Sequence, residues 1–259
     1  MSTLANAKHI LELIVRLRRD VTVSDVSNML GMPKSSASRT LSAMRKHGFL
    51  DRNTTTRAYR PGRIIMEASY HFRSTHGLLV LMEAQLERLI RETGYTAYID
   101  ILDGAYSLVI QMRVGAGALQ VYTPPGTRLP AHATSVGRAI LARIPDQEVL
   151  QLFDEMMSAS GKSQRIESPD KLLCKLAGIR DSGWELSSNG AIDNVAGIST
   201  AVMDPSTHQV YGLSIAFPAQ HLNESLVKDF SRTITDVAQG IGQQVGDPYW
   251  LAFRPRDET

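Results

Sequence analysis

The sequence predicts an α+β chain of two unequal units, a small helical unit followed by a larger unit of mixed helices and strands. Its 259 residues are enough for one or two domains. Hydrophobic residues make up 43% and charged residues 21%, a composition that supports buried cores and excludes disorder over most of the chain. Apolar residues recur at helical spacing up to residue 50, whereas strand-like alternation interrupts the helical pattern beyond residue 95.

Charge is distributed unevenly between the two units. Residues 1–65 hold 12 of the 28 Lys and Arg residues but only 4 of the 26 Asp and Glu residues, a local net charge of +8. The remaining 16 basic and 22 acidic residues give the rest of the chain a net charge of −6, so the total is only +2. A basic unit joined to an acidic one indicates a nucleic-acid-binding module fused to a second function; the alternative is a solvated basic face.

Cysteine content and hydropathy exclude several other classes of protein. The one cysteine, Cys174, excludes a disulfide within the chain and a cysteine metal cluster, and we expect it to be a small core residue. No apolar run approaches the roughly 18 residues of a membrane span, and the first residues lack a basic region followed by an apolar stretch. We therefore expect a cytoplasmic protein with no membrane partner.

The first 50 residues carry the pattern of three consecutive helices. Residues 4–19 have apolar positions at helical spacing. Thr22 is placed to cap a short second helix, with Asp25 three residues later as its capping-box partner, and Gly31 is placed to end it. Pro33 then begins a third helix, since proline suits a first helical turn.

The third helix has the two faces expected of a helix that enters a major groove. Its inner positions, Ala37, Leu41 and Met44, are apolar at helical spacing, and Gly48 ends the helix. Its outer positions combine basic and small hydroxyl side chains, which permit close approach and donate hydrogen bonds to phosphates and base edges. These outer residues are Lys34, Ser35, Ser36, Ser38, Arg39 and Ser42.

Residues 51–60 have the pattern of two short strands around a polar turn, with Arg52, Arg57 and Arg60 available to phosphates. Three helices followed by such a hairpin form a winged helix-turn-helix. We expect DNA contacts at Thr22, Lys34, Ser35, Ser36, Ser38, Arg39, Arg45, Arg57, Tyr59 and Arg60. A helix-turn-helix that packs against another protein has a similar pattern and is the alternative.

The larger unit alternates between helical and strand patterns. We expect helices at residues 63–75, 78–94, 146–157, 169–181 and 222–246, and strands at residues 97–102, 106–112, 195–203 and 210–217. Pro248 and Pro255 indicate that residues 247–259 form a tail. The pattern as a whole predicts a mixed α+β domain.

A further short helix is expected within residues 131–143, where either Thr134 or Ser135 caps the first turn. The first N–H groups of a helix lack partners within it and can bind an anion. An ordinary capped helix is the alternative at this position.

Several segments resemble the IclR-type family of bacterial transcriptional regulators. Residues 23–50, with VSDV, LGMPKSSASRTL and HGFL, resemble the DNA-binding domain of that family. LPAHATSVGRAILA at 129–142 resembles its effector-domain segment, and SGWE at 182–185, VAGISTAV at 195–202 and LSIAFP at 213–218 resemble its later motifs. The resemblance implies a winged helix-turn-helix, a linker helix and a GAF/PAS-like ligand-binding domain, assembled as dimers or tetramers on DNA.

The resemblance and the patterns together give the expected domain boundaries. The winged helix-turn-helix is expected at residues 1–62, the linker helix at 63–75, the effector-binding domain at 76–246 and the C-terminal tail at 247–259.

The resemblance also implies where a small-molecule effector binds. We expect its contacts at Tyr98, Thr134, Ser135, Val136, Gly137, Ser187, Gly197, Ser214 and Ala216. The chain departs from the family pattern in three places, with Ser187-Ser188 instead of an acidic pair, Gly197 at a frequent cysteine position and Ala216 where a second serine can occur. These changes predict a more apolar cavity in which serine hydroxyls remain as donors.

The expected effector is a small organic carboxylate with an apolar body, for which an aromatic ring is one option. Its carboxylate would meet the N–H groups near Ser135–Gly137, and its body would face Tyr98, Ile99, Val136 and Ala216. We expect it to shift the chain between DNA-competent and incompetent arrangements. The chain would then act as a repressor or activator on a pseudo-palindromic operator, as a homodimer or homotetramer.

Two other classes of function compete with this one. An enzyme with an appended DNA-binding domain could use His132 with Ser135, or Cys174 with a histidine, but no Gly-x-Ser-x-Gly elbow surrounds Ser135. The seven histidines form no His-x-x-x-His pair. A structural DNA-bridging protein has no need of a large ligand-type domain. We therefore expect no catalytic residue, no metal site and no cofactor.

Overall fold

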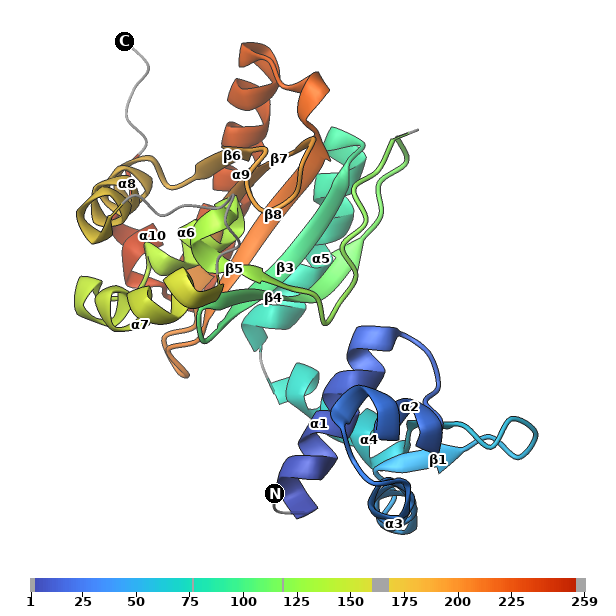
Figure 1. Ribbon diagram of the computed structural model, residues 1–259. Helices are drawn as coiled ribbons and strands as arrows, with labels where there is room; N and C mark the ends of the chain where they lie inside the picture. The colour runs from blue at the N-terminus through green and yellow to red at the C-terminus, as the bar shows by residue number, and fades with distance from the viewer. Residues whose placement is uncertain (1–2, 76, 118, 160–167, 255–259) are drawn as a thin grey trace. The chain divides into compact units, whose positions relative to one another are not determined.

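The computed structural model describes residues 3–75, 77–117, 119–159 and 168–254 (Figure 1). Its contacts divide the chain into two compact units, Met1–Gly77 and Leu78–Thr259. Each unit buries a hydrophobic core of its own. No helix in these ranges is both long and apolar enough to cross a bilayer.

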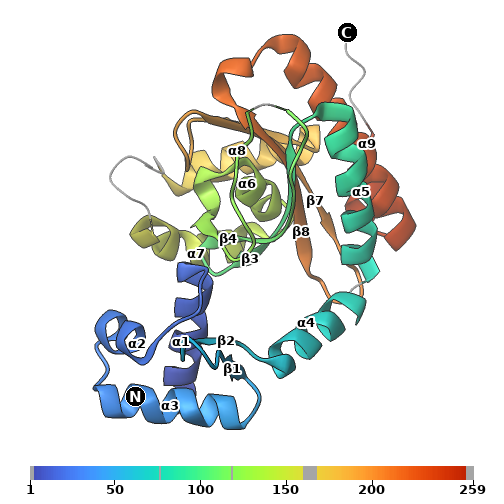
Figure 2. The same cartoon turned by 90° about the vertical axis from the view of Figure 1, so that its right-hand side faces the viewer.

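The first unit is a winged helix-turn-helix, as predicted. Its helices are α1 (Thr3–Leu17), α2 (Val23–Leu30), α3 (Lys34–Lys46) and α4 (Arg63–Thr75), and its wing strands are β1 (Leu50–Arg52) and β2 (Tyr59–Pro61). The two strands pair antiparallel, with Asp51 opposite Arg60. Apolar side chains of α1, α2, α3 and β1 meet in one core, which includes Ile10, Val26 and Leu41. Figure 2 shows these elements gathered together.

The turn between α2 and α3 is fixed by local signals that the sequence carries. The Thr22 hydroxyl accepts the N–H of Asp25 at 3.1 Å, and the Asp25 carboxylate accepts the N–H of Thr22 at 2.8 Å, which completes the predicted capping box. Hydrogen bonds from Arg19 and Thr22 hold the pKa of Asp25 well below its usual range. Gly31 ends α2 with φ +64°, a left-handed conformation that favours glycine.

The second unit is built on one six-stranded antiparallel sheet. Its strands are β3 (Thr96–Asp103), β4 (Tyr106–Arg113), β5 (Arg128–Pro130), β6 (Glu185–Ser188), β7 (Val195–Met203) and β8 (Val210–Pro218). Their order in the sheet is β5-β4-β3-β8-β7-β6. The predicted hairpin of β3 and β4 is present, whereas the short strands β5 and β6 at the two edges were not predicted.

Helices cover both faces of this sheet. They are α5 (Gly77–Thr93), α6 (Ser135–Leu141), α7 (Asp146–Ala159), α8 (Pro169–Ser182), α9 (Glu224–Val245) and α10 (Pro248–Ala252). In Figures 1 and 2, α5 and α9 lie on one face and α6, α7 and α8 on the other. The α5–α9 face holds the main core, with Met82, Ile99 and Ile234 fully buried.

Helix α6 lies close against the sheet because two glycines leave room for it. A side chain at Gly137 would collide with the backbone of Ala131, and one at Gly212 on β8 would collide with Val136 of α6. The α6 helix therefore packs directly on the middle of the sheet.

The expectation of a tail at residues 247–259 is wrong for the part that the structure describes; residues 255–259 lie outside it. Asp247 accepts the N–H of Tyr249 at 3.0 Å and begins α10, with Pro248 in the first turn. Trp250 is fully buried, and its indole N–H donates to the carbonyl of Ala201 at 2.9 Å. A large aromatic side chain docked in the core holds this segment in place.

The prediction for Cys174 is also wrong. Its side chain is exposed on α8, because the inward positions of that helix are taken by Leu172, Leu176 and Ile179.

Candidate functional site

The exposed face of α3 carries the basic and hydroxyl side chains predicted to contact DNA. Ala37, Leu41 and Met44 are buried, so α3 turns the opposite face outward. Lys34, Ser35, Arg39, Ser42 and Arg45 are exposed, and Ser36 and Ser38 are half-buried. The structure thus places the predicted α3 residues on one accessible surface.

The cations of this surface are not neutralised by acidic side chains. Within the ranges that the structure describes, Lys34, Arg39 and Arg45 have no ion-pair partner. The wing adds Arg57 and Arg60, which are exposed and likewise unpaired. Unpaired cations beside small hydroxyls are suited to a phosphate backbone.

Two residues predicted to contact DNA have other roles in the structure. Tyr59 is only 2% exposed, because its ring packs in the core of the first unit beneath the guanidinium of Arg52. The Thr22 hydroxyl accepts from the Asp25 N–H and donates to the Asp25 carboxylate, so both of its functions serve the helix cap. Contact of these two side chains with DNA stays a prediction.

The second unit contains a cavity between the α6 face of the sheet and the loops that cross it. Its empty volume is about 540 Å³, a figure that includes open solvent at its mouth. Strands β3, β4, β5, β7 and β8, the start of α6, and the 121–123 and 187–192 segments form its wall. The lining residues are Tyr98, Asp100, Val109, Val121, Thr123, Leu129, Thr134, Ser135, Val136, Ser187, Gly190, Ala191, Ile192, Val195, Gly197, Ser214 and Ala216.

The polar groups at the α6 end of the cavity are held by one another. Thr134 is the residue that caps α6, and its hydroxyl accepts the N–H of Gly137 at 2.9 Å. The hydroxyls of Ser135 and Ser199 form a hydrogen bond of 2.7 Å. The Tyr98 hydroxyl donates to the carbonyl of Val121 at 2.6 Å and so ties a crossing loop to the sheet.

Eight of the nine predicted effector contacts line this cavity, and Gly137 does not. Its N–H is already bound by Thr134, and its Cα packs against Ala131. Ile99, which was expected to face the effector, points into the core on the opposite face because successive strand residues alternate. The same alternation places Tyr98 and Asp100 together on the cavity face.

Asp100 is a lining residue that the sequence interpretation missed. It is 3% exposed, and its Oδ1 atom has no hydrogen-bond partner among the described residues. Burial raises its pKa to about 7, because the charged form is poorly solvated there. A charged residue within an apolar strand, in phase with Tyr98, was the signal that could have found it.

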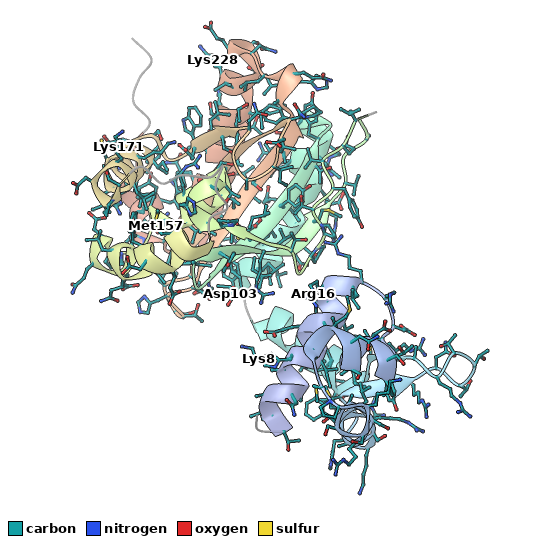
Figure 3. The ribbon with its side chains drawn as sticks, in the orientation of Figure 1. Lys8, Arg16, Asp103, Met157, Lys171 and Lys228 are labelled. Atoms are coloured by element: carbon teal, nitrogen blue, oxygen red, sulfur yellow. The ribbon has the colours of Figure 1, made fainter. Side chains whose placement is uncertain are left out.

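A half-exposed ion pair lies at the turn of the β3–β4 hairpin. Figure 3 labels Asp103 at this turn, where its carboxylate accepts from Nε of Arg128 at 2.6 Å. The pair ties β5 to the hairpin, but both side chains are nearly half exposed and lie outside the cavity wall. Among the residues that the structure describes, no three His, Cys, Asp or Glu side chains cluster as metal ligands would.

Comparison with known proteins identifies both units. The family model of the bacterial transcriptional regulator IclR C-terminal domain matches residues 71–243, and that of the IclR helix-turn-helix domain matches residues 3–54. The HTH-type transcriptional regulator XynR of Escherichia coli is 23% identical over 96% of this chain and 98% of its own length.

Solved structures share the fold over nearly the whole chain. A transcriptional regulator from Alicyclobacillus acidocaldarius aligns with a TM-score of 0.79 at 17% identity, over 94% of this chain and 98% of that one. An IclR homolog from Microbacterium hydrocarbonoxydans, solved as a complex with 4-hydroxybenzoate, aligns with a TM-score of 0.77 at 23% identity, over 95% and 99% of the two chains.

Proposed function

Because this chain belongs to the IclR family of bacterial transcriptional regulators, we propose that α3 reads an operator and that the cavity of the second unit binds the controlling effector. The observation that supports the proposed DNA binding is the exposed basic face of α3, whose cations have no ion-pair partner in the described chain. Lys34, Arg39 and Arg45 share it with the hydroxyls of Ser35 and Ser38. Short side chains admit the helix to a major groove, and the guanidinium of Arg39 can bind a guanine edge.

The wing has a different role in the proposed complex. Arg57 and Arg60 hold phosphates, which fixes the register of α3 on the duplex without reading sequence. A homodimer or homotetramer places two such units on the half-sites of a pseudo-palindromic operator, as a repressor or an activator. Its place of action is the cytoplasm, where bacterial DNA lies.

The proposed effector is a small organic carboxylate with an apolar body. The cavity walls supply apolar surface from Val109, Val136 and Ala216. At the start of α6, the N–H groups of Ser135 and Val136 have no acceptor within the helix and are available to a carboxylate. The relative solved with 4-hydroxybenzoate supports an aromatic body.

The chain is proposed to act by binding, without turnover of the effector. Its relatives are named as regulators, and effector binding needs only a difference in affinity between two DNA-binding states. An enzyme with a DNA-binding appendage is the competing function. Incubating the full chain with an effector that releases DNA, and recovering that compound unchanged, separates the two.

The test of the DNA part is a pair of single substitutions measured on operator DNA and on random DNA over a range of salt. We expect Arg60→Ala to weaken binding to both DNAs and to reduce the salt slope by about 1, as the loss of one phosphate contact would. Arg39→Ala should instead weaken operator binding by about 1–3 kcal/mol more than random binding. Arg88→Ala, which removes a cation from an exposed pair on α5, is the matched control. Equal losses on both DNAs for Arg39→Ala would remove it from the base-reading residues.

A further inference from the structure

The cavity wall contains one buried carboxyl group that the fold does not use. Asp100 is 3% exposed on β3 between its neighbours β4 and β8, opposite Val109 and Gly212. Its Oδ1 atom has no hydrogen-bond partner within the described chain, although the atom is shielded from solvent. A buried polar atom without a partner destabilises the folded state, so its presence calls for an explanation.

The surroundings of Asp100 offer no counter-charge. None of the described residues that line the cavity is Lys, Arg or His. The α6 helix that covers this part of the sheet contains Arg138, but its guanidinium is held on the other side by Glu185 and by the carbonyl of His132. The side chains that line the cavity therefore supply no cation to Asp100, and its carboxyl group can take a donor from a molecule in the cavity.

We propose that Asp100 is the specificity-determining contact of the cavity and that the effector presents a hydroxyl group to it. This inference rests on the proposed function, because it takes the cavity to be the effector site. It adds to the effector a second polar group, distinct from the carboxylate at the start of α6. The ligand class is thus a hydroxy-acid with an apolar body between its two polar ends.

A hydroxyl matches the site better than either charged alternative. A second carboxylate would add a like charge to a cavity that has no cation among its described lining residues. An ammonium group carries three N–H donors and loses much of its hydration in a cavity whose lining is mostly apolar. A hydroxyl has one donor, and its oxygen can accept in turn from the carboxyl when Asp100 is protonated.

Two matched series of compounds test the proposal on the full chain. The aromatic series is benzoate, 4-hydroxybenzoate, 4-(aminomethyl)benzoate and terephthalate. The aliphatic series is butanoate, 4-hydroxybutanoate, 4-aminobutanoate and butanedioate. Affinities are measured by isothermal titration calorimetry. In at least one series, we expect the hydroxyl member to bind about 10-fold to 100-fold more tightly than its unsubstituted parent, because a site built for a hydroxyl rejects the analogue without one.

Variants at Asp100 show whether that preference depends on its carboxyl group. Asp100→Leu should abolish the difference between the hydroxyl member and its parent, and Asp100→Asn, which keeps the shape, should reduce it. Asp103→Asn is the matched control, since it makes the same change on the same strand outside the cavity. It should leave both affinities as they are in the unsubstituted chain.

A second readout needs no ligand. If Asp100 is kept for binding, removing its unsatisfied carboxyl group should raise the melting temperature of the ligand-free chain at pH 7 by at least about 2–4 °C in Asp100→Leu. A carboxyl group that serves the fold would instead lower the melting temperature when it is replaced, in Asp100→Asn as well.

The outcomes separate this inference from the proposed function. Any of three results overturns the inference about Asp100. The first is that the parent compound, the amine or the diacid binds as tightly as the hydroxyl member in both series, and the second is that no member binds. The third is that both Asp100 variants have a lower melting temperature than the unsubstituted chain. If a carboxylate still releases operator DNA while the Asp100 variants keep the same preferences, the effector function stands and the role of Asp100 falls. If no carboxylate affects DNA binding, the proposed effector class falls first.

Discussion

Replacing Asp247 by asparagine removes the charge from an ion pair whose carboxylate is fully buried. Nη2 of Arg143 lies 2.6 and 2.9 Å from the two carboxylate oxygens, and the N–H groups of Met203 and Tyr249 also donate to them, at 2.8 and 3.0 Å. The Arg143 side chain is 8% exposed, so the substitution leaves a buried guanidinium without its counter-charge. The amide of asparagine also has one acceptor atom fewer than the carboxylate.

The expected loss is large for one substitution. Breaking a buried ion pair from one side costs about 3–5 kcal/mol, and in a unit of this size each kcal/mol lowers the melting temperature by about 2–4 °C. We therefore expect Asp247→Asn to lower the melting temperature of the second unit by about 6–20 °C. Asp103→Asn breaks a half-exposed pair with Arg128, which is worth about 1 kcal/mol or less, and is the matched control.

Tryptophan fluorescence reports on this unit alone. The chain has two tryptophans, Trp184 and Trp250, and both lie in the second unit. Trp250 packs against Gly242 and its indole N–H binds the carbonyl of Ala201, so its emission follows the docking of the C-terminal segment. A melting temperature for Asp247→Asn within about 4 °C of the unsubstituted chain, or equal to that of the control, would refute the ion pair as the anchor of this segment.

Three further predictions follow from buried or capping groups. The pKa of Asp100 is about 7 in the folded chain and about 4 in an unfolded one, so the folded state binds more protons between these values and stability falls by about 4 kcal/mol as pH rises across them. Asp100→Asn should remove that decline. If the melting temperatures of the variant and of the unsubstituted chain change with pH in the same way between pH 4 and pH 7, this prediction is wrong. Thr22→Ala should cost the first unit about 1 kcal/mol, measured by helical circular dichroism in urea, whereas an unchanged midpoint would show that the cap contributes nothing. Gly212→Ala should destabilise the second unit by about 1–3 kcal/mol by pushing Val136 away from the sheet, and an unchanged melting temperature would show that α6 can move freely.

The winged helix-turn-helix could be predicted from the sequence because its signals are local. The capping box of Thr22 and Asp25, the left-handed Gly31 and the apolar positions of α3 all act within a few residues of one another. Local patterns did not reveal that Tyr59 is buried, because its burial depends on its pairing with Val21, far away in the chain.

The C-terminal segment shows the opposite case. Asp247 followed by Pro248 is itself a helix-start pattern, but two prolines within a short stretch favoured a tail. What holds the segment is the docking of Trp250 against Gly183 and Gly242, which lie in different elements. No periodicity within the segment encodes those contacts, so the sequence could not give its burial.

Two buried aspartates of the second unit, Asp247 and Asp100, indicate what the cavity is for. Asp247 is surrounded by donors from Arg143, Met203 and Tyr249, so the fold itself accounts for its burial. Asp100 is only 3% exposed, yet its Oδ1 atom meets no donor in the described chain. A fold that can satisfy one carboxylate so fully has no structural need to leave another unsatisfied, since an apolar residue on β3 would stabilise the unit. The cost at Asp100 is therefore best explained by a molecule that removes it on binding, and such a molecule stabilises the second unit in proportion to its affinity.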